Sequence, residues 1–172
     1  VVTVRDIAEG KDYKEAYDKL VLSPGAEPVR PPLPGAEDPR VFTLRNIPDA
    51  FRIREYMLNA HPKTAVVVGG GFIGIEIAEN LIRAGISVII AELSDHVIGT
   101  LDYDMACEVH RYLLHKSVGL MLGRSVKAFH PEDERLGVEL DNGDTLQADM
   151  ALMTVGVRPD TGLAKNAGID IN

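Results

Sequence analysis

The sequence lacks several features that would assign it to particular classes of protein. Its 172 residues include one cysteine, so no disulfide can form within the chain, and this favours a reducing compartment such as the cytoplasm. No apolar run is long enough to cross a bilayer and no signal peptide is visible, so a membrane partner is not expected. Lysine and arginine total 18 against 26 acidic residues, and the net charge of −8 argues against a nucleic-acid partner.

The stretch that organises the rest of the chain is residues 64–78, with the sequence TAVVVGGGFIGIEIA. The β-branched run 66–68 predicts a strand that is buried on both faces. Gly69, Gly71 and Gly74 then form a G-x-G-x-x-G pattern, and apolar residues continue at helical spacing as far as residue 82. A strand, a glycine-rich turn and a helix in this order are typical of a dinucleotide-binding unit.

Each glycine of this pattern has its own role in a dinucleotide site. Gly69 allows the tight turn, Gly71 lets a pyrophosphate approach the backbone, and Gly74 lets the helix pack close to the strand. The helix N-terminus offers unpaired N–H groups and a partial positive charge to the phosphates. Glu92 closes a second predicted strand, 87–92, and lies 18 residues after Gly74, where an acidic ribose ligand is expected.

The sequence favours NAD(H) over NADP(H). Glu92 can accept hydrogen bonds from both hydroxyls of the adenosine ribose, and its charge would repel a 2′-phosphate. No arginine or lysine occurs between Leu93 and Leu101 to bind such a phosphate. We therefore expect NADH to bind about tenfold or more tightly than NADPH.

The remaining elements precede and follow this unit. The start of the chain, 1–4, predicts a strand that forms a hairpin with 17–22 across 9–12, and the six prolines of 24–39 predict an irregular linker. Asn46 is the predicted N-cap of a helix that runs to about Ala60. Its expected inner face is Ala50, Ile53 and Met57.

A third helix is predicted at roughly 103–116, with Asp102 or Asp104 as its N-cap. Its expected inner face consists of Met105, Val109, Tyr112 and Leu113. A short strand is predicted after it, at 120–122.

The last part of the chain changes to strands in succession. Residues 126–129, 137–140 and 145–146 predict a meander whose Asn-Gly turn lies at 141–144, and 151–155 predicts a final strand. With 45% hydrophobic residues, the chain is long enough to fold around a sizeable core. The expected fold class is α/β, with a Rossmann-like parallel sheet, helices on both faces and an antiparallel three-stranded β-meander. Both ends look cut, because 169–172 stops where another strand is expected to begin.

Three ordered stretches together resemble the pyridine nucleotide-disulfide oxidoreductases, flavoenzymes that pass a hydride from NAD(P)H to FAD. They are 17–26 (YDKLVLSPGA), 68–80 (VGGGFIGIEIAEN) and 154–161 (TVGVRPDT), and the similarity is greatest to the coenzyme A-disulfide reductase and NADH oxidase branch. In that family the NAD domain is inserted into the FAD domain. The resemblance therefore implies a strand pair and crossing segment at 1–26, a proline-rich linker at 27–45, an NAD(H)-binding domain at 46–153 and a return crossing at 154–172.

The resemblance also shows what this sequence does not contain. The family's FAD-binding glycine loop, its redox cysteine and its later Gly-Asp motif are absent. The chain is therefore expected to be the NAD(H)-binding part of an enzyme whose other parts carry FAD and form a homodimer, and to be inactive alone. Cys107 has Asp104 and Glu108 nearby, so we do not expect it to be the redox cysteine.

The resemblance assigns roles to residues beyond the glycines. Gly70 and Ile73 belong to the pyrophosphate loop, and Phe72 matches an aromatic residue that lies over the flavin and yields to nicotinamide. Glu76 matches a glutamate that contacts the nicotinamide carboxamide, and Gly156 matches a glycine beside the nicotinamide. Three of these residues also have an ordinary explanation. Phe72 suits the start of a helix as an apolar residue, Glu76 suits the helix dipole as a carboxylate, and Gly156 allows a turn.

Other patterns carry less weight, and no catalytic or metal-binding residue is predicted. Tyr112 and Lys116 match the Tyr-x-x-x-Lys pair of short-chain dehydrogenases, but Tyr112 is expected on the inner face of its helix. His110 and His115 do not share a helix face as metal ligands would, so both are expected to be solvated. The segment 141–144 resembles part of a calcium loop but lacks the later glutamate.

The sequence does not identify the electron acceptor of the intact enzyme. An NADH oxidase would reduce oxygen and a coenzyme A-disulfide reductase a disulfide, whereas a related reductase would act on a rubredoxin-like protein or nitrite. A free-standing NADH sensor would have no electron acceptor.

Overall fold

The computed structural model of the chain describes residues 1–171. These residues form two compact units: Val1–Gly25 with the residues from Pro159 onward, and Ala26–Arg158. Every buried hydrophobic side chain lies between Ala36 and Met153, so the second unit holds the core. No helix within residues 1–171 is long and apolar enough to span a membrane.

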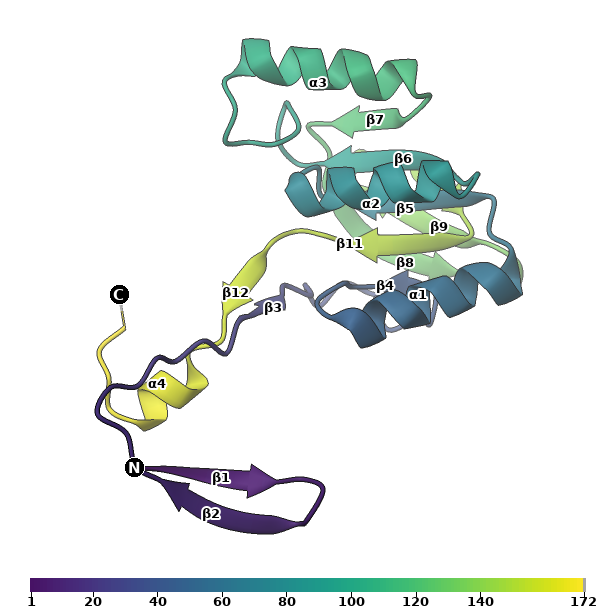
Figure 1. Cartoon of the computed structure of the whole chain (residues 1–172). Helices are drawn as coiled ribbons and strands as arrows, with labels where there is room; N and C mark the ends of the chain where they lie inside the picture. Colours follow the sequence, from purple (N-terminus) through teal and green to yellow (C-terminus); the bar gives the residue numbers. More distant parts are fainter. Residues whose placement is uncertain (172) are drawn as a thin grey trace. The chain divides into compact units, whose positions relative to one another are not determined.

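The larger unit is built on a five-stranded parallel sheet (Figure 1). Its strands, in spatial order, are β4 (Val41–Phe42), β11 (Met150–Met153), β5 (Thr64–Val68), β6 (Ser87–Glu92) and β7 (Gly119–Leu122). In the central register, Val66 lies between Ile89 on one side and Ala151 on the other. All four pairings are parallel, so the carboxyl ends of the strands meet at one edge of the sheet.

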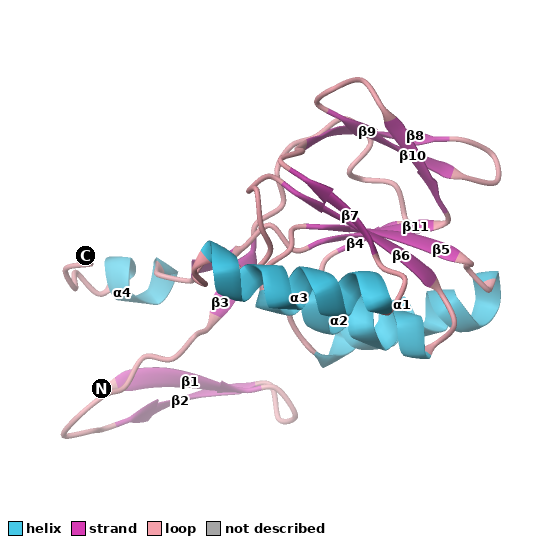
Figure 2. Cartoon of the chain, turned by 90° about the horizontal axis from the view of Figure 1, so that it is seen from above, coloured by secondary structure: helices cyan, strands magenta, loops and turns pink. Residues whose placement is uncertain are grey.

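The two faces of this sheet are covered differently (Figure 2). Helices α1 (Ile47–Ala60), α2 (Phe72–Arg83) and α3 (Tyr103–His115) cover one face, and the antiparallel strands β8 (Val126–Pro131), β9 (Leu136–Leu140) and β10 (Thr145–Ala148) cover the other. The fold class is therefore confirmed as a parallel sheet with flanking helices and a three-stranded antiparallel sheet. The expectation of helices on both faces was wrong, because the meander itself is the second covering layer.

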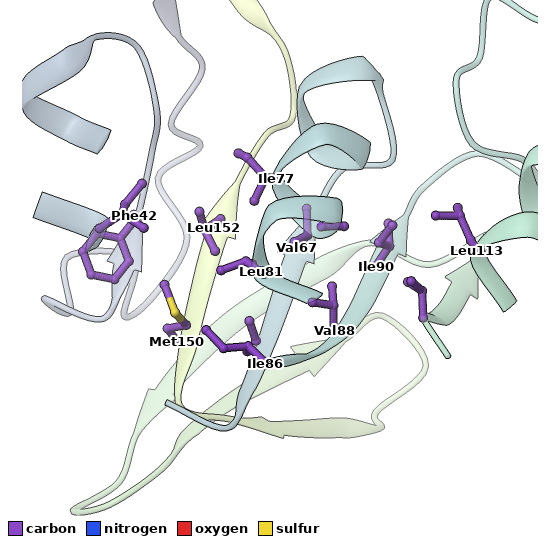
Figure 3. Packing of buried hydrophobic residues seen from close by; sticks show 14 of the residues in the cluster. Phe42, Val67, Ile77, Leu81, Ile86, Val88, Ile90, Leu113, Met150 and Leu152 are labelled. Carbon is purple, nitrogen blue, oxygen red and sulfur yellow. The ribbon is translucent and has the colours of Figure 1, made fainter. Parts of the chain in front are cut away.

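The alternation of side chains along β5 explains the two cores. Val67 packs with the helices, whereas Val66 and Val68 pack with the meander. The helix-side core is shown in Figure 3, and its labelled members are Phe42, Val67, Ile77, Leu81, Ile86, Val88, Ile90, Leu113, Met150 and Leu152. A continuous apolar strand sequence indicates that both faces are buried, but it does not indicate what covers them.

Helix α1 begins where the sequence predicts. The side chain of Asn46 accepts a hydrogen bond from the Asp49 backbone N–H, and the Asp49 carboxylate accepts one from the Asn46 backbone N–H, which completes a capping box. Of the expected inner face, Ile53 is buried and Met57 is half-buried, but Ala50 is exposed.

Helix α3 has the expected bounds, and two of its four expected inner-face residues are confirmed: Leu113 is buried, and Val109 is half-buried against the helix-side core. Ala106 and Leu113 are its buried residues, whereas Met105 and Tyr112 are 56% and 58% exposed. The prediction was wrong for Met105 and Tyr112, because Ala106 and Leu113, one position further along, are the residues that are buried.

The smaller unit contains a hairpin of β1 (Val2–Asp6) and β2 (Lys11–Glu15) and a short helix α4 (Gly162–Asn166). The predicted partner of the first strand, 17–22, has no regular structure, so that prediction was wrong. The Asp6 carboxylate accepts hydrogen bonds from the backbone N–H groups of Ala8 and Glu9, which fixes a tight turn leading directly into β2. Residues 169–171 form no strand, and Asn172 lies outside the described residues.

The segment 24–39, expected to be irregular, contains one short strand, and the linker expected at 27–45 also includes β4. Strand β3 (Ala26–Pro28) pairs with β12 (Val157–Pro159), which follows the last strand of the parallel sheet. The Val29 N–H also donates to the Gly156 carbonyl at 2.9 Å. The chain therefore enters and leaves the larger unit through adjacent extended segments.

Candidate functional site

A cavity of about 460 Å³ lies at the carboxyl edge of the parallel sheet. Its walls come from the ends of β5, β6 and β11, from the turn between β7 and β8, and from Pro31 and Leu33. Ligands of open parallel sheets bind outside the carboxyl ends of their strands. The site is therefore in the position that the fold class predicts for a bound ligand.

The turn after β5 requires glycine for two different reasons. Gly69 has φ +104°, and a Cβ added there would lie 2.6 Å from the Thr154 carbonyl oxygen. A Cβ on Gly74 would lie far inside van der Waals contact of the Gly69 carbonyl oxygen. Close packing between the turn, helix α2 and the end of β11 therefore excludes side chains at both positions.

Gly71 differs from these two glycines because it faces open space. A Cβ added to Gly71 would meet no atom within 4 Å, and its φ of −74° is available to any residue. Gly71 is also the N-cap of α2, and it provides no side chain to pair with the helix's first N–H groups. The structure thus leaves an unfilled space in front of unpaired backbone donors, which is the arrangement that a phosphate group fits.

Thr154, at the end of β11, fixes the shape of the glycine turn. Its hydroxyl lies 3.0 Å from the Val68 carbonyl oxygen and 2.9 Å from the Gly69 carbonyl oxygen, and its backbone N–H donates to Val68 at 2.7 Å. The sequence patterns gave this threonine no separate role. The feature of the sequence that could have indicated it is a hydroxyl residue directly after the apolar run 150–153, which forms the strand beside β5.

Glu92 lies at the end of β6, on the wall of the cavity, and its carboxylate is held by two backbone donors. Its Oε2 accepts a hydrogen bond from the Gly70 N–H at 2.6 Å, and its Oε1 accepts one from the Ser94 N–H at 2.7 Å. Both oxygens keep a further lone pair for a ligand hydroxyl. The carboxylate is therefore oriented in the free chain and coupled to the glycine turn.

The loop 93–101 is anchored on two sides. The Ile98 N–H donates to the Gly70 carbonyl at 2.8 Å, and the Val97 N–H donates to Nε2 of His110 on α3 at 3.1 Å. His110 is therefore half-buried and bonded, and the expectation that it is solvated was wrong. Burial lowers the pKa of His110, and His96 nearby lowers it further, because both disfavour the charged ring.

The structure brings together four of the predicted site residues and separates the others. Gly69, Gly71, Glu92 and Gly156 line the cavity, and Gly156 has φ +112°, which favours glycine. Gly70 and Gly74 are buried behind the turn. Phe72, Ile73 and Glu76 lie on the exposed first turns of α2 and do not line the cavity; Phe72 is 63% exposed.

Arg124 is a cavity residue that the sequence patterns did not indicate. It follows β7, and its backbone N–H donates to the Glu92 carbonyl at 2.9 Å. A basic residue near the ribose was expected only within 93–101, which follow Glu92 in the chain. Arg124 reaches the same wall from the neighbouring strand, and no local spacing could have indicated it.

The competing patterns lie away from this cavity. Tyr112 is exposed on α3, with the Lys116 ammonium 5.4 Å from its ring centroid, so its expected place on the inner face was wrong. Cys107 is half-buried on the same helix. Within residues 1–171, no three His, Cys, Asp or Glu side chains are grouped to bind a metal.

Comparison with known proteins gives consistent matches over the whole chain. Residues 1–172 match the family described as pyridine nucleotide-disulphide oxidoreductase. An NADH oxidase of Methanocaldococcus jannaschii is 37% identical over 164 residues, which are 95% of this chain and 36% of that protein. The chain thus spans about a third of that relative's length.

Solved structures agree with the sequence matches. The crystal structure of reduced Bacillus anthracis CoADR-RHD is 40% identical with a TM-score of 0.90, over 99% of this chain and 30% of that one. The water-forming NADH oxidase of Lactobacillus brevis, bound to NADH, is 30% identical with a TM-score of 0.80, over 95% of this chain and 36% of that one.

Proposed function

We propose, since this chain belongs to the pyridine nucleotide-disulphide oxidoreductase family, that it is the NAD(H)-binding part of an FAD-dependent oxidoreductase. In the intact protein it would bind NADH and hold the nicotinamide against the flavin for hydride transfer. The observation that best supports this is the meeting of the glycine turn and Glu92 on the wall of one cavity.

The order of the strand ends supports one direction for the coenzyme along the cavity. The turn after β5, with the N-terminus of α2, suits the pyrophosphate, and the open space at Gly71 leaves room for it. Glu92, at the end of the neighbouring strand β6, suits the adenosine ribose. Gly156 follows β11, on the other side of β5, and suits the nicotinamide end.

We propose that the exposed first turns of α2 face the flavin-bearing part of the intact protein. Phe72 and Ile73 present neighbouring apolar side chains to solvent here, and an exposed apolar patch is the kind of surface that another part of a protein covers. Phe72 would lie over the flavin and yield to nicotinamide, and Glu76 would contact the carboxamide, as the family resemblance implies.

NADH supplies the hydride in this chemistry, and the chain holds the nicotinamide ring in place. Holding the nicotinamide in a fixed place beside the flavin makes the transfer nearly unimolecular, which removes much of its entropic barrier. The chain's own task is therefore to bind and orient the coenzyme, and we assign none of its residues a catalytic role.

The electron acceptor depends on parts of the relatives that this chain does not span. The similar proteins suggest an NADH oxidase or a coenzyme A-disulfide reductase as the type of enzyme. We propose a homodimer, as the family resemblance implies, and a place in the cytoplasm, which the single cysteine favours. A related reductase acting on a rubredoxin-like protein or nitrite would use the same NADH-binding part. A free-standing NADH sensor would bind NADH here without any flavin, so the FAD content of the intact protein separates these classes.

Binding of NADH to the chain is tested by calorimetry with two matched glycine variants. A Cβ added to either Gly71 or Gly99 would meet only open space, but of the two only Gly71 lines the cavity. We expect one NADH per chain, with binding lost or weakened at least about tenfold in Gly71→Ala and kept in Gly99→Ala. Absence of saturable NADH binding, or equal affinity in the Gly71→Ala variant, would refute the proposal.

A further inference from the structure

Arg124 is held beside the carboxylate that the proposed function assigns to the ribose. Its backbone N–H donates to the Glu92 carbonyl at 2.9 Å, and the preceding Gly123 N–H donates to the Ser94 carbonyl at 2.8 Å. Gly123 has φ +65°, so the turn after β7 needs a residue that tolerates this conformation. These bonds place the base of the Arg124 side chain on the same wall as Glu92.

The two opposite charges on this wall are not paired with each other. Both carboxylate oxygens of Glu92 accept from backbone N–H groups, those of Gly70 and Ser94. The Arg124 guanidinium donates to the Gly123 carbonyl at 3.2 Å, and within residues 1–171 no carboxylate lies within 4.0 Å of it. Most of its five N–H donors are therefore available to an anion in the cavity.

The position of Arg124 relative to the coenzyme follows from the strand order. The pyrophosphate is assigned to the end of β5 and the ribose to the end of β6, and β7 is the next strand along. A phosphate on the ribose 2′-oxygen would thus lie beside Glu92 and in front of the turn that carries Arg124. A guanidinium suits this group, because its planar donors match two phosphate oxygens.

We propose that Arg124 binds the adenosine 2′-phosphate of NADPH and so determines how far this chain accepts NADPH beside NADH. This inference rests on the proposed function, because it uses the same cavity and the same direction of the coenzyme. Glu92 still favours NADH, but its repulsion of the 2′-phosphate is partly offset by the neighbouring cation. If so, NADH is preferred over NADPH by less than the roughly tenfold that the sequence pattern alone predicts.

The test compares an arginine variant and a lysine variant by calorimetry with NADH and NADPH at low salt. Arg124→Gln removes the cavity cation, and Lys127→Gln removes an exposed cation three residues away on β8 that does not line the cavity. We expect Arg124→Gln to weaken the binding of NADPH about fivefold or more and the binding of NADH less than about twofold. Lys127→Gln should change neither affinity. The same Arg124→Gln variant should weaken the binding of the fragment 2′-AMP about fivefold or more and that of 5′-AMP less than about twofold.

Salt provides an independent measure of the same contact. Raising the salt concentration should weaken NADPH more than NADH in the natural chain, and this difference should shrink in Arg124→Gln because the screened ion pair is gone. Circular dichroism of the variants checks that each is folded, which the exposure of both side chains favours.

Three results would overturn the inference. Unchanged NADPH affinity in Arg124→Gln would mean that the guanidinium does not reach the phosphate. Equal losses for NADH and NADPH would mean that Arg124 acts on a group that both coenzymes share, and the proposed function would still stand. Failure of the natural chain to bind NADH at all would remove the proposed function and this inference together.

Discussion

At the scale of single residues, the loop beside the glycine turn depends on one uncharged histidine. Nε2 of His110 accepts the Val97 N–H, so the ring proton must lie on Nδ1. Protonation of Nε2 would break this bond. Asp95 and His96 are the charged and titratable groups that act on the ring, and Asp95 opposes the lowering of its pKa.

The stability of the chain should therefore depend on pH through His110. Because its folded-state pKa is below the unfolded value of about 6.5, the unfolded chain binds a proton first as the pH falls. Stability contributed by the neutral ring is complete above that value and is lost as the pH falls towards the folded pKa.

His110→Gln keeps an acceptor at similar reach but does not titrate. We expect the free energy of unfolding to fall less steeply between pH 7 and pH 5 in this variant than in the natural chain, as measured by urea denaturation. His115→Gln, at the exposed end of the same helix, should keep the natural slope. Equal slopes in all three proteins would show that His110 does not carry the pH dependence.

Sequence spacing predicted the residues of the site that are close together in the chain. The glycine turn and Glu92 belong to one β-α-β unit, so their positions follow from local pattern. Thr154, His110 and Arg124 were missed because each reaches the site from a distant part of the chain through the pairing of strands or the packing of a helix. Such contacts leave no fixed spacing in a single sequence.

At the scale of elements, the seating of α2 on the glycine turn depends on Gly74. A methyl group there would collide with the Gly69 carbonyl and would lie 2.8 Å from the Thr154 hydroxyl oxygen. Backbone atoms cannot move aside as a flexible side chain can, so the helix itself would have to shift.

Gly74→Ala should therefore destabilise the chain by about 1–3 kcal/mol, as overpacked cores do. The measurement is chemical denaturation followed by circular dichroism. Gly71→Ala is the matched control on the same turn, and it should cost at most about 1 kcal/mol, because its surroundings are open and alanine is only a poorer N-cap residue than glycine. A Gly74→Ala protein as stable as this control would contradict the packing role.

The elements that the sequence predicted well carry strong local signals. Helix α1 has its capping box, and β5 and β6 have continuous apolar runs. Strand β2 was missed because its polar sequence, KDYKE, buries nothing and is specified by the turn before it. Strand β4 has two residues, and its pairing of Val41 with Ala151 joins segments far apart in the chain.

At the scale of the whole molecule, the chain should bind NADH without oxidising it. Its sequence contains one G-x-G-x-x-G turn, which the coenzyme would occupy, and no second turn of this kind for FAD. With added FAD and NADH, absorbance at the nicotinamide band should fall no faster than with free FAD alone. The NADH oxidase of Methanocaldococcus jannaschii, to which the chain is similar, serves as the positive control.

Two results would contradict this expectation. One is steady NADH oxidation by the chain above the rate with free flavin. The other is FAD that copurifies with the chain in equal amount, because this would require a flavin site within these 172 residues.

The pairing of β3 with β12 has a consequence for how such a unit can be moved between proteins. Adjacent strands lie about 5 Å apart, so residues 26–158 begin and end almost at the same point. A gene segment that encodes them could be spliced into a surface loop of an unrelated host while hardly separating the two sides of that loop. A single recombination event could therefore insert or remove residues 26–158 as a whole without changing the fold of the host protein around the loop.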